Sequence, residues 1–277
     1  MLLHGIGHHR QAWRPVTRLL ADEFDLIACD TPGFGASPPL PAGVRPAIGA
    51  YVEAFRRFFL ELGLERPHVA GNSMGGGIAL ELARVGAVSS ACALSPVGFW
   101  SERERRFSRA SLRYLVAETP TFVRPAVKAL VRTRAGRAVL LSQLCGWPAR
   151  MPTEEAVDSL RDAWEAPAFL ATLEAFGDYE FVSGEELREV PVTIAWGVRD
   201  RLLTYSRQAP RARSRLPWAR HLALGAGHLP YFDDPAAVAE VLRMSARPPS
   251  GDTPVSSRSV DAGGDPAEAG LHPAQLA

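Results

Sequence analysis

The sequence predicts an α/β protein whose mostly parallel central sheet carries helices on both faces. Short apolar runs typical of buried strands alternate along the chain with longer segments of helical periodicity. Such alternation implies right-handed crossovers between parallel strands, with helices covering both faces of the sheet. A second observation is that the strand signal vanishes between residues 99 and 186, where helical patterns alone remain. Functional sites in such folds lie at the carboxyl ends of the strands.

Six short runs are the candidate strands. In chain order they are "MLL", "DLIAC", "HVAG", "SACALS", "VTIAW" and "RHLALG". Between the second and third runs, aromatic residues and leucine recur at helical spacing from Tyr51 to Leu62. Gly63 follows this pattern directly and is expected to end the helix.

We expect a core, an inserted cap and a tail. Residues 1–98 and 187–245 contain the strand candidates and form the predicted core, and residues 99–186 form a helical cap inserted between two strands. Residues 246–277 are rich in Pro, Gly, Ser and Asp and poor in apolar side chains. Burial cannot offset the entropy of ordering such a segment, so we expect a disordered tail there.

Composition and charge argue against nucleic-acid and membrane proteins. The 31 Lys and Arg nearly balance the 30 Asp and Glu, and the net charge of +1 creates no overall field that attracts nucleic acid or an anionic membrane. No run reaches the roughly 18 apolar residues of a membrane span, and the N-terminus lacks a signal-peptide pattern. We therefore expect no membrane span and a cytoplasmic location. His8 and His9 have no carboxylate at metal-ligand spacing, so no metal is expected.

The stretch "VAGNSMGGGIALEL" places a single serine where a strand gives way to a helix. This strand-turn-helix context is the one that a nucleophile elbow requires, with Ser73 as the nucleophile. The flanking glycines allow a sharp turn and a close approach of helix to strand where a Cβ would clash. The hydroxyl also lies beside a helix N-terminus, which favours negative charge.

A serine nucleophile needs a base and an orienting carboxylate. His228 in "ALGAGHLPYFDDP" is the best-placed histidine, because it follows the last strand candidate across a loop of small residues. Asp200 in "VTIAWGVRDRL" follows the preceding strand candidate and is the predicted acid. Three other acidic residues are interpreted structurally: Asp233 and Asp234 are expected to cap the last helix, and Asp30 to shape its own loop.

The oxyanion of an acyl-transfer intermediate needs two backbone donors. The N–H of Met74 directly follows the nucleophile, and Ile6 in "HGIGHH" is the second predicted donor because neighbouring glycines let the main chain turn inward. For the substrate pocket we expect contributions from His4, Trp100 and Leu229, although His4 is expected mainly to shape the loop after the first strand. The pocket is predicted to be apolar.

Five motifs carry a family resemblance: "LLHGIG", "DTPGFGAS", "GNSMGG", "WGVRD" and "GAGHLPYFDDP". In order and spacing they resemble the α/β-hydrolase superfamily over about residues 1–245, and Ser73, Asp200 and His228 follow the chain order of its triad. The resemblance implies the α/β-hydrolase fold with an eight-stranded sheet, a cap between strands six and seven, and hydrolysis through an acyl-serine without a cofactor. The first strands are missing at the N-terminus, so we expect that Met1 is a misplaced start.

Several activities are compatible with these residues. A serine at the elbow favours hydrolysis of a carboxylic ester, lactone or thioester of a small to medium apolar molecule. The alternatives are carbon–carbon bond hydrolysis of the meta-cleavage-product type, because "GNSMGG" also resembles that elbow, and a cofactor-free haloperoxidase or perhydrolase. A non-catalytic ligand-binding module on the same fold is the remaining alternative, which retention of all three triad residues disfavours.

Overall fold

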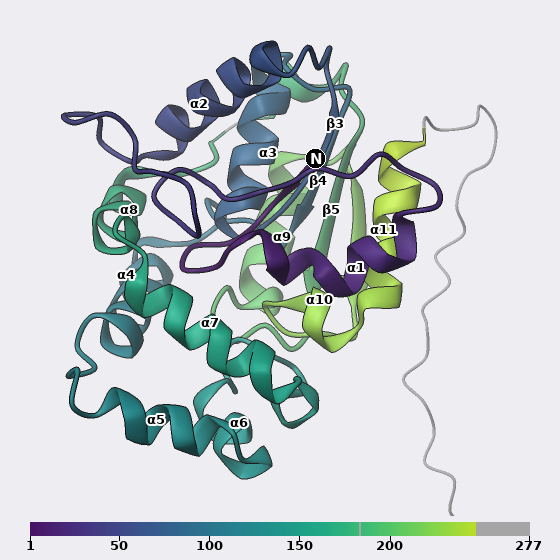
Figure 1. Ribbon diagram of the computed structural model, residues 1–277. Helices are drawn as coiled ribbons and strands as arrows, with labels where there is room; N and C mark the ends of the chain where they lie inside the picture. Colours follow the sequence, from purple (N-terminus) through teal and green to yellow (C-terminus); the bar gives the residue numbers. More distant parts are fainter. Residues whose placement is uncertain (183, 248–277) are drawn as a thin grey trace, which may run out of the picture. The chain divides into compact units, whose positions relative to one another are not determined.

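Six parallel strands form the sheet in the computed structural model, which describes residues 1–182 and 184–247 (Figure 1). Each strand coincides with a run that the sequence predicted, although β3 and β5 extend one residue further, to Asn72 and Gly197. The predicted fold class is confirmed. The resemblance implied eight strands, whereas the described residues form six. Their bounds are Leu2–Leu3 (β1), Ala28–Cys29 (β2), His68–Asn72 (β3), Ser90–Leu94 (β4), Val192–Gly197 (β5) and Arg220–Leu224 (β6).

The strand order is β2-β1-β3-β4-β5-β6, so the chain changes direction across the sheet between β1 and β3. Leu3, the last residue of β1, pairs with Gly71 near the end of β3. The segments that leave these two strands therefore lie beside each other at the carboxyl edge of the sheet. This is the switch point at which open parallel sheets form their sites.

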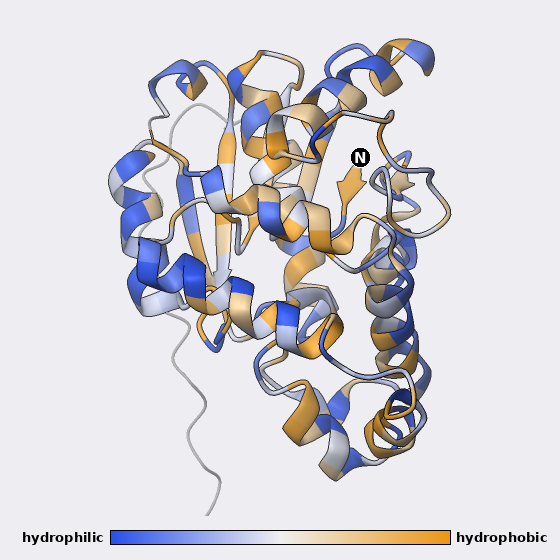
Figure 2. Ribbon diagram, turned by 90° about the vertical axis from the view of Figure 1, so that its left-hand side faces the viewer, coloured by the Kyte–Doolittle hydropathy of each residue, from blue (hydrophilic) through white to orange (hydrophobic). Residues whose placement is uncertain are grey.

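Helices cover both faces of the sheet. One face packs against α2 (Ile48–Glu61), α3 (Met74–Arg84) and α9 (Tyr205–Arg215). The other packs against α1 (Arg14–Leu20) and α11 (Pro235–Ala246), which follow the short helices η1 (Arg10–Trp13) and α10 (Pro230–Asp233). Figure 2 shows several strands in hydrophobic colours between helices that carry both hydrophilic and hydrophobic residues.

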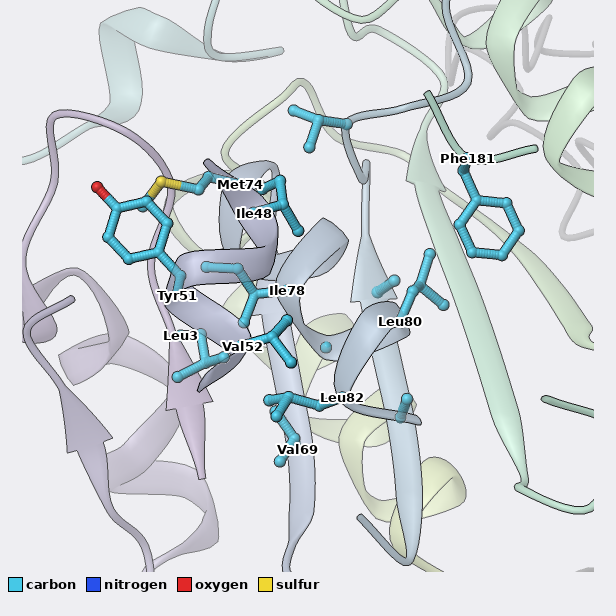
Figure 3. Close-up of a cluster of buried hydrophobic side chains, with 14 of the residues drawn as sticks. Leu3, Ile48, Tyr51, Val52, Val69, Met74, Ile78, Leu80, Leu82 and Phe181 are labelled. Atoms are coloured by element: carbon cyan, nitrogen blue, oxygen red, sulfur yellow. The ribbon is translucent and has the colours of Figure 1, made fainter. Parts of the chain in front are cut away.

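The packing of α2 follows from its sequence pattern. Tyr51, Phe55 and Phe59 are buried at helical spacing, as expected for one apolar face. Figure 3 shows side chains of α2 and α3 directed toward Leu3 and Val69 of the sheet. The helix ends at Glu61, and Gly63 adopts φ +66°, a left-handed conformation that glycine tolerates at helix ends. Its predicted role as a helix stop is confirmed.

Between β4 and β5 the described chain contains helices but no strand. We call residues 99–182 the helical segment. It comprises α4 (Glu102–Val116), α5 (Arg124–Val131), α6 (Arg134–Leu140), η2 (Pro148–Arg150), α7 (Thr153–Glu165), α8 (Phe169–Ala175) and η3 (Phe176–Asp178), and η4 (Glu185–Leu187) follows before β5. A capping box starts α4: the Glu104 carboxylate accepts from the Ser101 N–H at 2.7 Å, and Ser101 Oγ accepts from the Glu104 N–H.

After β6, the described residues continue through α11 to Arg247. The predicted tail, residues 246–277, lies outside the described residues from position 248 onward. Within residues 1–182 and 184–247, no helix combines the length and apolarity needed to cross a bilayer.

Candidate active site

Ser73 occupies the turn between β3 and α3 in a strained backbone conformation. Its φ of +55° and ψ of −112° are rare for a residue with a side chain. Three backbone hydrogen bonds hold it there: its N–H donates to Leu94 O at 2.9 Å, and its carbonyl accepts from Gly77 N at 3.0 Å and Val97 N at 3.2 Å. These hydrogen bonds therefore hold the turn in its strained conformation.

Two glycines permit the close packing around this turn. A Cβ added to Gly71 would overlap the backbone of Gly75, and one added to Gly75 would overlap the carbonyl of Leu3. The start of α3 thus lies directly against both β3 and β1. The glycine spacing in the sequence reflects this contact.

Asp200 and His228 form a buried hydrogen-bonded pair. His228 Nδ1 lies 2.8 Å from Asp200 Oδ2, and both residues are 3% exposed. The other oxygen, Oδ1, accepts from the N–H groups of Leu202 at 2.9 Å and Leu203 at 2.8 Å. With one carboxylate oxygen fixed by the backbone, the other faces the ring, which favours the tautomer with a proton on Nδ1.

Ser73 and His228 line the same cavity, so the structure brings all three predicted residues together. Among the described residues, no hydrogen bond joins Ser73 Oγ to His228. Hydrogen bonds of this kind are often loose in unliganded enzymes and tighten when substrate binds. The roles of these three residues remain predictions.

Asn72 connects the serine turn to the histidine loop, a role that the sequence analysis missed. Its Nδ2 donates to His228 O at 2.9 Å and to Leu94 O at 3.1 Å, and its Oδ1 accepts from Tyr231 OH at 3.3 Å. The residue lies between glycine and serine in the elbow motif, and its identity as a polar residue in a buried strand was the available signal.

Asp233 departs from its expected role. Asp234 does cap α11, because its Oδ1 accepts from the Ala237 N–H at 2.9 Å. The Asp233 carboxylate instead accepts hydrogen bonds from three backbone N–H groups, those of Gly146 at 2.7 Å, Trp147 at 2.8 Å and Gly227 at 2.7 Å. Because Asp233 ends α10, its carboxylate faces these loops and not the first turn of α11. It joins the helical segment to the loop that holds His228.

The two expected oxyanion donors lie at the same edge of the sheet. The N–H of Met74 is at the first residue of α3, where helix geometry leaves it without an intrahelical acceptor, and Ile6 lines the cavity. Neither N–H donates to another described residue. Their role in binding an oxyanion stays a prediction.

Two of the three expected pocket residues do not line this cavity. His4 is completely buried: its Nε2 accepts from Thr31 N at 3.0 Å, its Nδ1 lies 2.7 Å from Gly5 O, and burial lowers its pKa to about 4. It shapes the loop. Trp100 is buried within the helical segment, where its Nε1 donates to Tyr179 O at 3.0 Å. Leu229 does line the cavity.

The cavity has a polar floor and an aliphatic roof. It encloses about 580 Å³, including the part open to solvent, and no charged residue lines it. The floor comes from segments after the strands, with Gly5, Ile6, Gly7, His8, Asn72, Ser73, Leu202, His228 and Leu229. The roof comes from the helical segment, with Leu112, Leu115, Val116, Leu141, Leu144, Ser159, Leu160, Ala163 and Phe169.

His8 adds a second imidazole to the floor. Its ring packs near those of Tyr231 and Phe232, with centroids 6.3 and 6.1 Å away, and burial lowers its pKa to about 3. The ring is therefore neutral at physiological pH. The sequence analysis considered His8 only as a possible metal ligand and assigned it no role.

A roomier apolar cleft lies at the opposite, amino-terminal ends of the strands. It is lined by residues such as Leu26, His68 and Ser90 and contains none of the predicted site residues. The cleft therefore does not compete with the Ser73 cavity as the candidate active site.

Comparison with known proteins places this chain in a family. The model of a family described as the alpha/beta hydrolase family matches residues 1–241. An uncharacterized protein of Mycobacterium tuberculosis is 29% identical over 257 residues, covering 87% of this chain and 73% of that protein. An epoxide hydrolase of the same species is 27% identical over 192 residues, covering 66% of this chain and 86% of the relative.

A solved structure shows the same fold. A thermophilic esterase from Thermogutta terrifontis superposes with a TM-score of 0.67 at 21% sequence identity, covering 88% of this chain and 87% of the esterase. The matched family model spans most of the sequence, and the chain therefore belongs to the alpha/beta hydrolase family.

Proposed function

We propose that this hydrolase cleaves carboxylic esters, lactones or thioesters of small to medium apolar molecules through an acyl-serine intermediate. The observation that carries the proposal is the Asp200–His228 hydrogen bond of 2.8 Å. His228 lines the same cavity as Ser73, whose backbone is strained. An activated serine nucleophile needs such a base, oriented by a carboxylate and placed beside the serine.

In the proposed mechanism, Ser73 Oγ attacks the substrate carbonyl while His228 Nε2 takes the hydroxyl proton. Asp200 keeps the Nδ1 proton in place and stabilises the imidazolium. The N–H groups of Ile6 and Met74 bind the oxyanion. His228 then protonates the leaving group, and a water molecule activated by the same ring hydrolyses the acyl-serine.

The proposed substrate class follows from the roof of the cavity. Helices α4, α7 and α8 and the segment after α6 contribute mostly apolar side chains, so an uncharged acyl or aromatic group is favoured over an anionic one. We propose that residues 99–186 act as a cap on a core of residues 1–98 and 187–245. The epoxide hydrolases of this superfamily use an aspartate nucleophile, so Ser73 argues against that activity here.

The test is turnover of p-nitrophenyl esters of increasing acyl length, with a ring-fission diketone assayed in parallel. Ser73→Ala is expected to lower kcat by about 10³-fold or more. Ser159→Ala is the matched control, because Ser159 lines the same cavity but donates its hydroxyl to Glu155 O, and it is expected to keep wild-type turnover.

Two outcomes would count against the proposal. Ester turnover that survives Ser73→Ala unchanged excludes the serine mechanism. Turnover of the diketone without turnover of any ester assigns the site to carbon–carbon bond hydrolysis instead.

A further inference from the structure

The net charge of +1 conceals an uneven distribution of charge along the chain. From residue 102 to residue 140, which spans α4 to α6, there are ten Arg or Lys and only three acidic residues, all glutamate. The preference of this chain for arginine over lysine does not explain the shortage of acids. Arg103, Arg105 and Arg109 form no ion pair with any residue in the described part of the chain.

The exposed aromatic side chains gather in the same stretch. Among the described residues, three Phe, Tyr or Trp side chains are exposed: Phe107 (56%), Tyr114 (73%) and Phe122 (83%). The first two lie seven residues apart on α4, which puts them about 10 Å apart along one side of the helix. Phe122 follows in the loop before α5.

Helix α4 therefore has two different faces. Leu112, Leu115 and Val116 face the cavity. The opposite side, together with the following loop, exposes a set that we call the basic-aromatic face, formed by Arg103, Arg106, Phe107, Arg113, Tyr114 and Phe122. Two of its arginines form exposed ion pairs, Arg106 with Glu102 and Arg113 with Glu118 and Glu174. In Figure 1, α4, α5 and α6 lie at the periphery of the molecule, away from the sheet.

We propose that the basic-aromatic face binds the surface of an anionic phospholipid bilayer. Arginine and exposed aromatic side chains are both enriched in helices that bind a membrane interface. Each Arg or Lys near an anionic surface strengthens binding, while aromatic rings insert at the level of the headgroups. A symmetric dimer through this face is disfavoured, because it would bring two patches of the same positive charge together.

Binding in this orientation would place the bilayer against the outer side of the cavity roof. The same helix would then contact lipid on one side and line the cavity on the other. The proposal does not rest on the proposed ester hydrolysis, because it concerns the outer surface and is measured as binding.

The test is sedimentation of the full chain with vesicles of phosphatidylcholine alone or mixed with phosphatidylglycerol. Wild type is expected to sediment with the anionic vesicles only, and less so as NaCl is raised, because salt screens the attraction. A variant carrying Phe107→Ser, Tyr114→Ser and Phe122→Ser, and a second carrying Arg103→Glu and Arg106→Glu, are each expected to bind about tenfold more weakly or worse.

The matched control combines Leu60→Ser and Val85→Ser, which remove two exposed apolar side chains (80% and 50%) elsewhere on the surface. It is expected to bind like wild type, and equal melting temperatures would show that all the variants are folded. The proposal is overturned if wild type stays in solution with anionic vesicles. It is also overturned if the triple serine variant and the double glutamate variant both bind the vesicles as well as wild type. A wild-type dimer that the triple serine variant converts to a monomer, without vesicle binding, would assign this face to self-association.

Discussion

The two sides of the cavity are built on different principles. On the sheet side, Ser73, Asn72 and Asp200 are held by backbone hydrogen bonds at the ends of parallel strands. On the side of the helical segment, the lining is mostly apolar, carries no charged residue and comes from α4, α7, α8 and the segment after α6. The comparison suggests that reactivity belongs to the sheet edge and substrate selection to the helical segment, so substitutions on the two sides should have separable effects.

The largest separable effect is expected for Asp200→Asn on the sheet side. An amide there would favour the wrong tautomer of His228, and kcat on a preferred ester is expected to fall by about 10³- to 10⁴-fold with little change in KM. Asp178→Asn is the control, because Asp178 is 70% exposed at its side chain and pairs with Arg45 on the surface. A kcat that is the same in both variants would contradict the assigned role of Asp200.

Asp233 tests whether the two sides are coupled. An asparagine offers one acceptor oxygen where the carboxylate serves three N–H groups, so Asp233→Asn is expected to cost about 1–3 kcal/mol of unfolding free energy. Because Gly227 precedes His228, kcat is expected to fall about tenfold with a smaller change in KM. Asp234→Asn is the neighbouring control, since asparagine caps a helix as well as aspartate does. If both variants behave alike, Asp233 does not position the histidine loop.

Lowering the pH should reduce the free energy of unfolding, because the imidazoles of His4 and His8 are buried on the sheet side of the cavity. The pKa of His4 is about 4 in the folded protein and 6.5 as its ordinary value, so the unfolded chain takes up the proton first as pH falls through 6.5. Stability is therefore lost between pH 6.5 and 4, by about 2 kcal/mol at pH 5 for this residue. His8 acts in the same direction.

Urea unfolding at pH 7 and pH 5 measures this effect. The loss of unfolding free energy between the two pH values is expected to be smaller in His4→Gln than in wild type. An equal loss in both proteins would show that His4 does not carry the pH dependence.

The smallest effect is expected on the side of the helical segment. Leu112→Ala enlarges the roof of the cavity and should raise kcat/KM for longer acyl chains relative to short ones by about fourfold per methylene accommodated. Tyr114→Ala, on the opposite side of the same helix, is the control and should leave the chain-length preference unchanged. A shift of preference in the control alone would reverse the assignment of the two faces of α4.

Some features of this molecule could be predicted from the sequence and others could not, for physical reasons. Six strands and the Gly63 stop were predictable because they depend on local apolar patterns and glycine chemistry. The closeness of Ser73, Asp200 and His228 was predictable because parallel strands end at one edge. The contacts of Asp233 were not, because they join residues 87 positions apart through a loop geometry that no local pattern encodes.

His4 and Trp100 lie outside the cavity lining for a similar reason. Both follow strands at the correct edge, so the sequence placed them near the cavity. Their polar atoms instead bond to the backbone of Thr31 and Tyr179, partners brought in from distant parts of the chain. Proximity to an edge can be inferred from strand order, but the direction of a side chain depends on such partners.

The most direct test of the central claim is labelling with a fluorophosphonate, followed by mass mapping of the modified peptide. The account predicts one adduct on Ser73, its loss in Ser73→Ala, and strongly slowed labelling in Asp200→Asn, because the phosphonate reacts only with an activated hydroxyl. Labelling of wild type at another serine, or no labelling of the folded protein, would contradict the claim that Ser73 is the nucleophile.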